Sequence, residues 1–295
     1  MGFKLPERTR VSRRRLRRPV LLAGFVVLAL SLSGCATDNQ WERFGMPQQA
    51  STTGQHVLSL WQGAWIAALA TGVVTWALIL GSAFWFRRRS DDEIPVQTRY
   101  NLPIEIFYTI FPIIMVVAFF AHTVRVQNFA LEVSPHPDVT VNVVGQKWEW
   151  TFNQTVPSGP HQGKNVFVSG TGEDIPTLEI PVNKTVLFKL YSPDVIHDFG
   201  IPSFGMRMDV VPGEHNQYQI TPIATGTYDG KCYELCGTYH SRMLFNVEVV
   251  TWDKYVADMA KLATNPAHVS DQPILGGSYA STPYLNGNNL EEGSE

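Results

Sequence analysis

Two cysteines, one histidine and one methionine lie close together near the end of the sequence, and all four residue types can bind a metal ion. They are Cys232, Cys236, His240 and Met243. Soft thiolate and thioether ligands select copper, imidazole also suits it, and a weak axial methionine is typical of blue-copper-type sites. The second cysteine changes the expected metal count, because two thiolates can bridge two metal ions. The segment therefore predicts a dinuclear copper centre.

Each of the two ions would need one terminal histidine, so a second histidine must come from elsewhere in the chain. His197 ends a β-like run, where a sheet could bring it to the cysteines. Met243 and the carbonyl oxygen of Glu234, between the cysteines, can supply the remaining weak contacts. The other six histidines flank apolar segments or lie in polar stretches and have weaker claims: His56, His122, His136, His161, His215 and His268.

Three other interpretations of this segment remain open from the residues alone. A pair of cysteines outside the cytoplasm can form a disulfide bond. Two cysteines and two histidines can hold structural zinc, although zinc has no use for a methionine at that spacing. A site with one copper ion is the third alternative.

Two long apolar segments precede this region, and each is long enough to cross a bilayer. We expect transmembrane helices over residues 58–86 and 103–125, joined by a loop over 87–102 that begins with Arg87, Arg88 and Arg89. Clustered arginines in a short loop stay in the cytoplasm. The loop should therefore be inside, and both the segment before the first helix and everything after about Arg125 should be outside. Glu105 in the second helix either has a function, because ionisable residues within spans are costly, or reaches water from near the helix end.

The first residues are typical of an export signal. Eight basic residues and one acid precede Cys35, and an apolar run and Leu32-Ser33-Gly34 lead directly to that cysteine. Small residues just before a cysteine indicate a cleavage site, and this pattern resembles a bacterial lipoprotein box. We expect a signal peptide over 1–34, a lipid on Cys35 and an outer segment over 35–57; the alternative is an uncleaved anchor helix.

The remainder predicts an outer β domain over 126–263 and a tail over 264–295. Short runs rich in β-branched and aromatic residues alternate with turn signals, which favours an antiparallel sandwich or barrel. Residues 252–262 have helical spacing. The tail is rich in Pro, Gly, Ser and Asn, and we expect it to be disordered or to lie along the surface.

The net charge of −3 conceals an uneven distribution of charged residues. Removal of the Arg-rich start would leave acidic residues clearly in excess. Such a surface suits a basic protein partner and argues against nucleic acid.

The pattern Cys-x-Glu-x-Cys-Gly-x-x-His-Ser-x-Met over 232–243 resembles the CuA motif of cytochrome c oxidase subunit II, from the haem–copper oxidase family. The stretches 194–202 and 209–213 resemble the region of its first histidine. Residues of the second apolar segment fit as well: Asn101, Glu105, Tyr108, Thr109 and Pro112. The resemblance extends over roughly residues 58–262.

This resemblance implies a two-helix transmembrane hairpin followed by an all-β cupredoxin-like sandwich. It implies two coppers bound by His197, Cys232, Cys236, His240, Met243 and the Glu234 carbonyl, with the Glu234 side chain facing a magnesium or manganese ion at the catalytic subunit. Trp148 would receive the electron from a c-type cytochrome. Without the resemblance, the sequence favours Trp148 as a core aromatic on the same strand face as Trp150. Glu105 would lie near the mouth of a proton pathway.

The implied function is that of the electron-accepting subunit of a respiratory oxidase in a bacterial plasma membrane. Electrons would pass to haem in subunit I, where oxygen becomes water and protons are pumped. Lys147 and Glu149 depart from the family's common pattern beside Trp148. Subunit II of a quinol oxidase, which lacks the copper ligands, and a non-redox lipoprotein with a disulfide are the alternatives.

Overall fold

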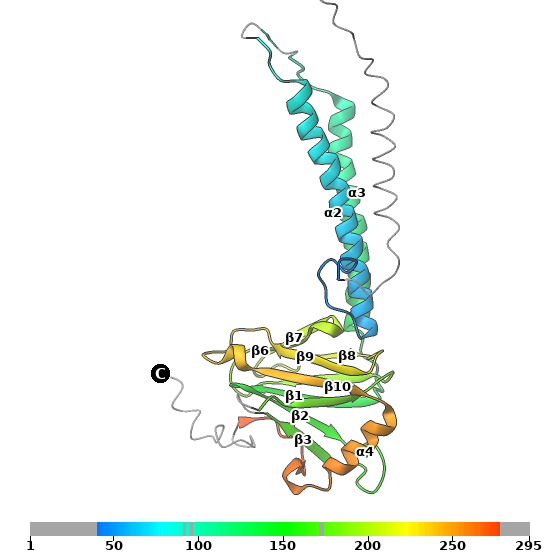
Figure 1. Ribbon diagram of the computed structural model, residues 1–295, viewed down its shortest axis with the longest axis vertical. Coiled ribbons are helices and arrows are strands. Elements are labelled where there is room, and N and C mark those ends of the chain that lie inside the picture. Colours follow the sequence, from blue (N-terminus) through cyan, green and yellow to red (C-terminus); the bar gives the residue numbers. More distant parts are fainter. Residues whose placement is uncertain (1–39, 91–92, 95–96, 171–173, 278–295) are drawn as a thin grey trace, which may run out of the picture.

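A two-helix hairpin and a two-layer β-sandwich form the protein (Figure 1). The computed structural model describes residues 40–90, 93–94, 97–170 and 174–277. The helices α2 (Thr52–Trp85) and α3 (Leu102–Leu131) run side by side and rise from one end of the sandwich. The predicted signal peptide and Cys35 lie outside the described residues.

Both helices extend beyond the apolar segments expected to span a membrane. Helix α2 begins six residues before residue 58 because Ser51 caps it: the Ser51 hydroxyl oxygen accepts the Gly54 N–H at 2.9 Å. The same hydroxyl donates to the carbonyl of Phe204 in the sandwich at 2.7 Å. Helix α3 continues past residue 125 and ends at Leu131. These extra turns join the hairpin to the sandwich.

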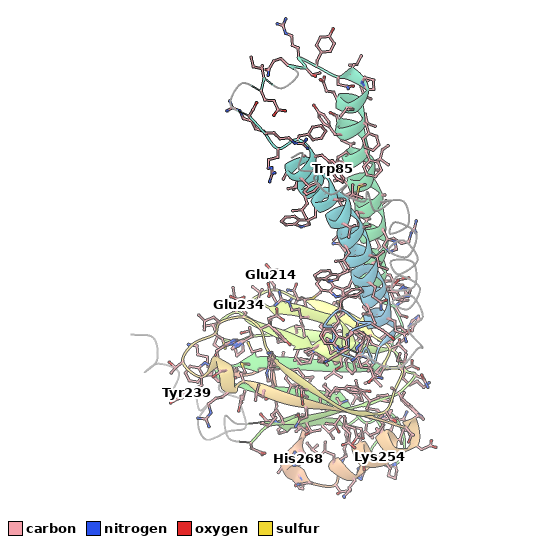
Figure 2. The ribbon with its side chains drawn as sticks, turned by 45° about the horizontal axis from the view of Figure 1, so that its top comes forward. Trp85, Glu214, Glu234, Tyr239, Lys254 and His268 are labelled. Carbon is pink, nitrogen blue, oxygen red and sulfur yellow. The ribbon has the colours of Figure 1, made fainter. Side chains whose placement is uncertain are left out.

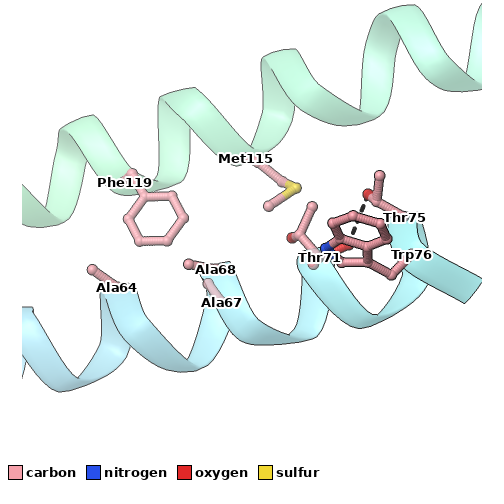
Figure 3. Close-up of a pocket in the computed structure, with 9 residues that line it drawn as sticks. Ala64, Ala67, Ala68, Thr71, Thr75, Trp76, Met115 and Phe119 are labelled. Atoms are coloured by element: carbon pink, nitrogen blue, oxygen red, sulfur yellow. Dashed lines mark hydrogen bonds between the residues drawn. The ribbon is translucent and has the colours of Figure 1, made fainter. Parts of the chain in front are cut away.

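The hairpin exposes the apolar surface that a membrane would cover. Both helices are long and apolar enough to cross a bilayer, and large apolar side chains such as Leu78, Trp85 and Val116 are mostly exposed. Between the helices lies a groove of about 450 Å³ (Figure 3). Small residues of α2 line one side of it, and Met115 and Phe119 of α3 line the other. An exposed surface of this kind suits lipid or neighbouring helices.

Two mixed sheets form the sandwich. The first has the order β11-β3-β2-β1-β5-β8 and the second β4-β10-β9-β6-β7. The first sheet comprises β1 (Val139–Gln146), β2 (Glu149–Thr155), β3 (Asn165–Ser169), β5 (Val186–Tyr191), β8 (Gln217–Ile220) and β11 (Val269–Ser270). The second comprises β4 (Thr177–Pro181), β6 (His197–Ile201), β7 (Met206–Val210), β9 (Gly226–Cys232) and β10 (Leu244–Val250).

The expectation of a purely antiparallel sandwich was wrong, because each sheet contains one parallel pair. Strand β1 pairs in parallel with β5, and β4 pairs in parallel with β10. The partners in these pairs are far apart in the sequence, so no hairpin signal accompanies them. The two-layer, all-β architecture is as predicted.

Aromatic side chains from both sheets fill the space between the layers. Trp150 and Phe152 of β2 meet Phe199 of β6 and Phe245 of β10, with ring centroids 4.7–6.1 Å apart. All four are almost fully buried. Offset and edge-on aromatic pairs add to the stabilisation from burial. This rigid core supports the ends of β6, β9 and β10, where the metal-binding residue types lie.

The chain closes with one helix and a surface segment. Helix α4 (Trp252–Leu262) matches the predicted range, and short 3₁₀ helices are η1 (Pro202–Phe204), η2 (His240–Arg242) and η3 (Pro266–His268). The described part of the tail lies along the first sheet, where the Asn153 amide exchanges two hydrogen bonds with the backbone of Ile274, at 2.7 and 2.9 Å. This part is surface-hugging, as expected.

Candidate metal centre

The predicted ligands come together at one end of the sandwich, on the ends of two adjacent strands. Cys232 is the last residue of β9 and His197 the first of β6, and these strands pair antiparallel with Phe199 opposite Cys232. The loop after Cys232 returns to Met243, whose carbonyl accepts the Cys232 N–H at 3.0 Å. Cys236 and His240 lie within this closed loop, so the strand pairing fixes the positions of all five residues.

The donor atoms of these residues lie within a few ångströms of one another. The sulfurs of Cys232 and Cys236 are 3.9 Å apart and are not bonded. The Nδ1 atom of His197 is 3.9 Å from the Cys232 sulfur, and Nδ1 of His240 is 3.5 Å from the Cys236 sulfur. The Met243 sulfur is 3.8 Å from that of Cys236, and the Glu234 carbonyl oxygen is 3.2 Å from that of Cys232. His197, both cysteines and Met243 are buried.

These separations suit donors that share metal ions. With a metal–sulfur bond of about 2.3 Å and a metal–nitrogen bond of about 2.0 Å, two ligands at tetrahedral angles lie roughly 3.5–3.8 Å apart. The Sγ–Sγ, Sγ–Sδ and His240–Cys236 separations fall in or near that range. Soft sulfur together with imidazole is the donor set that copper selects. The residues therefore fit copper in the donor set and in the spacing.

The donors form a compact group. Among the described residues, the Cys, His and carboxylate ligand atoms that all lie within 4.8 Å of one another belong to His197, Cys232 and Cys236. His240 lies beside Cys236, and the Met243 sulfur and the Glu234 carbonyl oxygen add two more donors. A tetrahedral ion takes four ligands, so these six donors are more than one such ion can bind.

Asp194 orients the His197 ring, and this carboxylate did not emerge from the sequence. The Nε2 atom of His197 lies 2.9 Å from Asp194 Oδ1, so a donated N–H leaves Nδ1 free to face Cys232. Asp194 also accepts the backbone N–H of Lys147 and of Val195. A carboxylate that holds the far nitrogen of a ligating histidine is a common feature of metal sites. The only sign of this partner in the sequence was an acidic residue three positions before His197.

Local hydrogen bonds set the protonation of this pair of residues. Burial alone would raise the pKa of the Asp194 carboxyl, but hydrogen bonds from His197 and from two backbone N–H groups outweigh it and hold that pKa below its ordinary value. Burial would lower the pKa of His197, yet the hydrogen bonds to Asp194 and Cys232 raise it. The carboxylate is therefore negative at neutral pH and keeps the imidazole in place.

The two thiols influence each other strongly. The hydrogen bond between them lowers the pKa of Cys232, assisted by His197 and by two backbone groups, and it raises the pKa of Cys236, where burial acts in the same direction. The pair thus readily gives up one proton but holds the second. Thiols must be deprotonated to bind metal, so loading the site releases this remaining proton.

Trp148 lies beside the centre, in the turn between β1 and β2. The sequence placed it on a strand that shares a face with Trp150, but β2 begins one residue later, at Glu149. Trp150 is fully buried, whereas Trp148 is partly exposed. Its Nε1–H donates to the carbonyl of Cys236 at 3.3 Å. The turn therefore places an indole between solvent and a predicted ligand.

Glu234 lies in the loop of the metal centre, whereas Glu105 lies in helix α3 of the hairpin. The Glu234 side chain is exposed, and Figure 2 shows it at the end of the sandwich away from the attachment of the hairpin, nearer the helix side than Tyr239. Glu105 lies in the first turn of α3, where its carboxylate accepts the backbone N–H of Asn101 at 2.9 Å. Glu105 thus helps to cap the helix, a structural role that the sequence had not suggested.

The chain thus combines a hairpin that is long and apolar enough to span a membrane with a β-sandwich whose sulfur and imidazole donors could hold a metal. A family model described as "Cytochrome C oxidase subunit II, periplasmic domain" matches residues 173–250. The chain is 42% identical over 286 residues to "Probable cytochrome c oxidase subunit 2" of Streptomyces coelicolor, covering 86% of this chain and 90% of the relative. It is 32% identical over 299 residues to "Cytochrome c oxidase subunit 2" of Mycobacterium tuberculosis, covering 83% and 81%.

The chain belongs to the cytochrome c oxidase subunit 2 family. Its enzyme class is therefore that of an oxidase subunit, as the sequence motif had indicated. Among solved structures, the periplasmic domain of subunit II of the cytochrome oxidase of Bradyrhizobium japonicum is 25% identical and covers 45% of this chain and 98% of that one, with a TM-score of 0.39.

Proposed function

We propose that this chain accepts electrons from a c-type cytochrome at a dinuclear copper centre and passes them to haem in the catalytic subunit of the oxidase. Oxygen would be reduced to water in that subunit, coupled to proton pumping. The observation that carries the proposal is the donor group: two thiols 3.9 Å apart with an imidazole Nδ1 beside each, together with the Met243 sulfur and the Glu234 carbonyl oxygen. These six donors are more than one tetrahedral zinc ion binds, and a disulfide would use only two of them.

Each ligand has a distinct task in this proposal. Cys232 and Cys236 would be the thiolate ligands that both ions share, His197 and His240 the imidazole ligands, and Met243 and the Glu234 carbonyl the weaker ligands. Copper held by these residues would supply one-electron chemistry. The protein keeps the site nearly dry and fixed, because the sulfur ligands are buried and stand on paired strands. A site that moves little on electron transfer has a low reorganisation cost.

The Glu234 side chain is proposed to bind a further metal ion, separate from the copper pair. Its carbonyl faces the Cys232 sulfur, while its carboxylate is exposed and free to meet a partner subunit. Magnesium and manganese favour carboxylate oxygens. We place such an ion at the contact with the haem-bearing subunit, so that one residue joins the copper centre to the interface.

Trp148 is the proposed receiver of the electron. It is partly exposed, and its indole N–H reaches the Cys236 carbonyl. A donor that docks over this ring would connect to the copper centre through one hydrogen bond and one ligand residue. The acidic balance of the chain suits a basic cytochrome and would speed its encounter.

The membrane arrangement is part of the same proposal. The arginines at 87–89 support a cytoplasmic hairpin loop in a bacterium, which would put the sandwich on the outer side of the plasma membrane. Glu105, near the cytoplasmic end of α3, would lie at the mouth of a proton pathway in addition to capping the helix. A lipid on Cys35 would provide a further anchor on the outer side.

Asp194 gives a specific test of how the centre is held. We expect Asp194→Ala to lower the copper affinity about 10- to 100-fold, the usual loss when a partner of a ligating histidine is removed. Competition with a copper chelator measures this affinity. Asp138→Ala is the matched control, because Asp138 also accepts backbone and side-chain hydrogen bonds, from Thr185, but precedes the opposite end of β1. Equal affinities in the two variants would contradict the positioning role.

Rapid mixing of the purified oxidase with a reduced c-type cytochrome tests the proposed function. The expected result is loss of the copper absorption band before the haem of the catalytic subunit becomes reduced. Reduction of that haem at full rate while the copper band stays unchanged would show that electrons bypass this chain.

A further inference from the structure

Two aromatic side chains, the partly exposed Trp148 and the exposed Tyr239, lie together beside the candidate metal centre. The rings of Trp148 and Tyr239 meet edge to face, with centroids 4.9 Å apart and planes at 88°. Tyr239 is 49% exposed, and Figure 2 shows it at the tip of the sandwich end. Tyrosine and tryptophan are the aromatic residues favoured at protein interfaces, because each offers a large rigid ring with one polar group. The proposed function uses only the tryptophan of this pair.

Both rings have a short connection to the proposed ligands, but by different routes. Trp148 reaches Cys236 through the hydrogen bond from its Nε1–H. Tyr239 is bonded through its own peptide to His240, whose Nδ1 faces the Cys236 sulfur at 3.5 Å. The tyrosine connection therefore consists of covalent bonds and needs no hydrogen bond.

Local packing fixes the position of both rings. Gly237 has a φ of +125°, and a Cβ there would lie 3.0 Å from the Trp148 ring, so glycine lets the indole lie against the loop. On the other side, the guanidinium of Arg242 lies over the Tyr239 ring, 5.7 Å from its centroid. Cations at this distance are attracted to an aromatic face. Tyr239 thus contacts both Trp148 and the exposed Arg242.

We propose that Tyr239 is a second contact for the electron donor, with its ring extending the surface of Trp148 toward the donor haem and its backbone leading to His240. This rests on the proposed function of the chain. One electron moves: the donor haem iron is oxidised by one electron, and the copper pair is reduced by one. No bond forms or breaks, no proton moves, and Tyr239 is not itself oxidised. The fitting partner has an apolar rim around an exposed haem edge.

The test measures the second-order rate at which a reduced c-type cytochrome reduces the copper centre in the intact oxidase. Tyr239→Leu keeps apolar bulk but removes the ring, and we expect the rate to fall about tenfold, as for an interface aromatic worth more than 1 kcal/mol. Tyr239→Phe should restore most of the rate, because the ring and not the hydroxyl makes the contact. Copper absorption and paramagnetic spectra of both variants should match those of the parent.

Leu235→Ala is the matched control. Leu235 lies in the same loop and is an apolar side chain exposed to a larger fraction than Tyr239, 78% against 49%, but it is not part of the aromatic pair. A clearly smaller loss with Leu235→Ala supports the proposal. An equal loss would mean that any apolar surface in this loop serves docking, and would overturn it.

The outcomes also separate this inference from the proposed function. If Tyr239→Leu reacts as fast as the parent while Trp148→Phe is slow, Tyr239 has no part in accepting electrons and the function stands. If the parent oxidase itself shows no reduction of copper by the cytochrome, the proposed function fails first. A rate that Tyr239→Phe lowers as much as Tyr239→Leu would point to the hydroxyl and contradict the role of the ring.

Discussion

Cys236→Ser should abolish the shared-electron copper centre and with it the acceptance of electrons from a cytochrome. The Cys236 sulfur contacts three other donor atoms, 3.9 Å from the Cys232 sulfur, 3.5 Å from His240 Nδ1 and 3.8 Å from the Met243 sulfur. A serine hydroxyl is a poor copper ligand compared with a thiolate. The rate of reduction should therefore fall by more than the roughly 10- to 100-fold typical of a lost outer partner of a metal ligand.

Copper content and the paramagnetic spectrum of the variant measure this effect. We expect fewer than two coppers per chain and loss of the multi-line pattern of an electron shared by two ions. Ser241→Ala is the control, because Ser241 is exposed in the same loop and is not one of the candidate metal ligands. Two coppers with an unchanged multi-line spectrum in Cys236→Ser would rule out bridging by this thiol.

Trp148→Phe should slow electron acceptance about tenfold and leave the copper centre intact. The substitution removes the indole N–H that reaches the Cys236 carbonyl and reduces the exposed ring. Trp148 supplies no metal ligand, so copper content and absorption should not change. Stopped-flow reduction by a c-type cytochrome measures the rate.

Trp252→Phe is the matched control for this experiment. Trp252 is also a partly exposed tryptophan packed against the core, but it begins α4 and follows β10 at the end of that strand opposite the metal centre. The control should react like the parent. If both tryptophan variants were equally slow, the effect would come from general stability and not from the path of the electron.

The sequence predicted the elements with local signals. Helix α4 was found at its observed bounds. The expected segment 103–125 lies within α3, and 58–86 lies within α2 except for its last residue, which caps that helix. The added turns of α2 depend on Ser51, whose capping is fixed by a contact with Phe204 far along the chain. The parallel pairing of β1 with β5 also joins distant segments, and alternation within a strand says nothing about its neighbour.

At the metal centre, residue type was more informative than position. Thiols, imidazoles and a thioether identified the candidate ligands, and the structure brings these residues together. Asp194 was missed because a carboxylate near a histidine is common in any sequence. Tyr239 was missed because its contact with Trp148 joins residues ninety-one positions apart, and only the fold brings them together.

Metal analysis of the purified oxidase, combined with its electron paramagnetic resonance spectrum, tests the central claim most directly. The account predicts two coppers bound to this chain and a multi-line signal from one electron shared between them. One metal ion per chain, or metal-free protein with Cys232 bonded to Cys236 after careful copper loading, would contradict it.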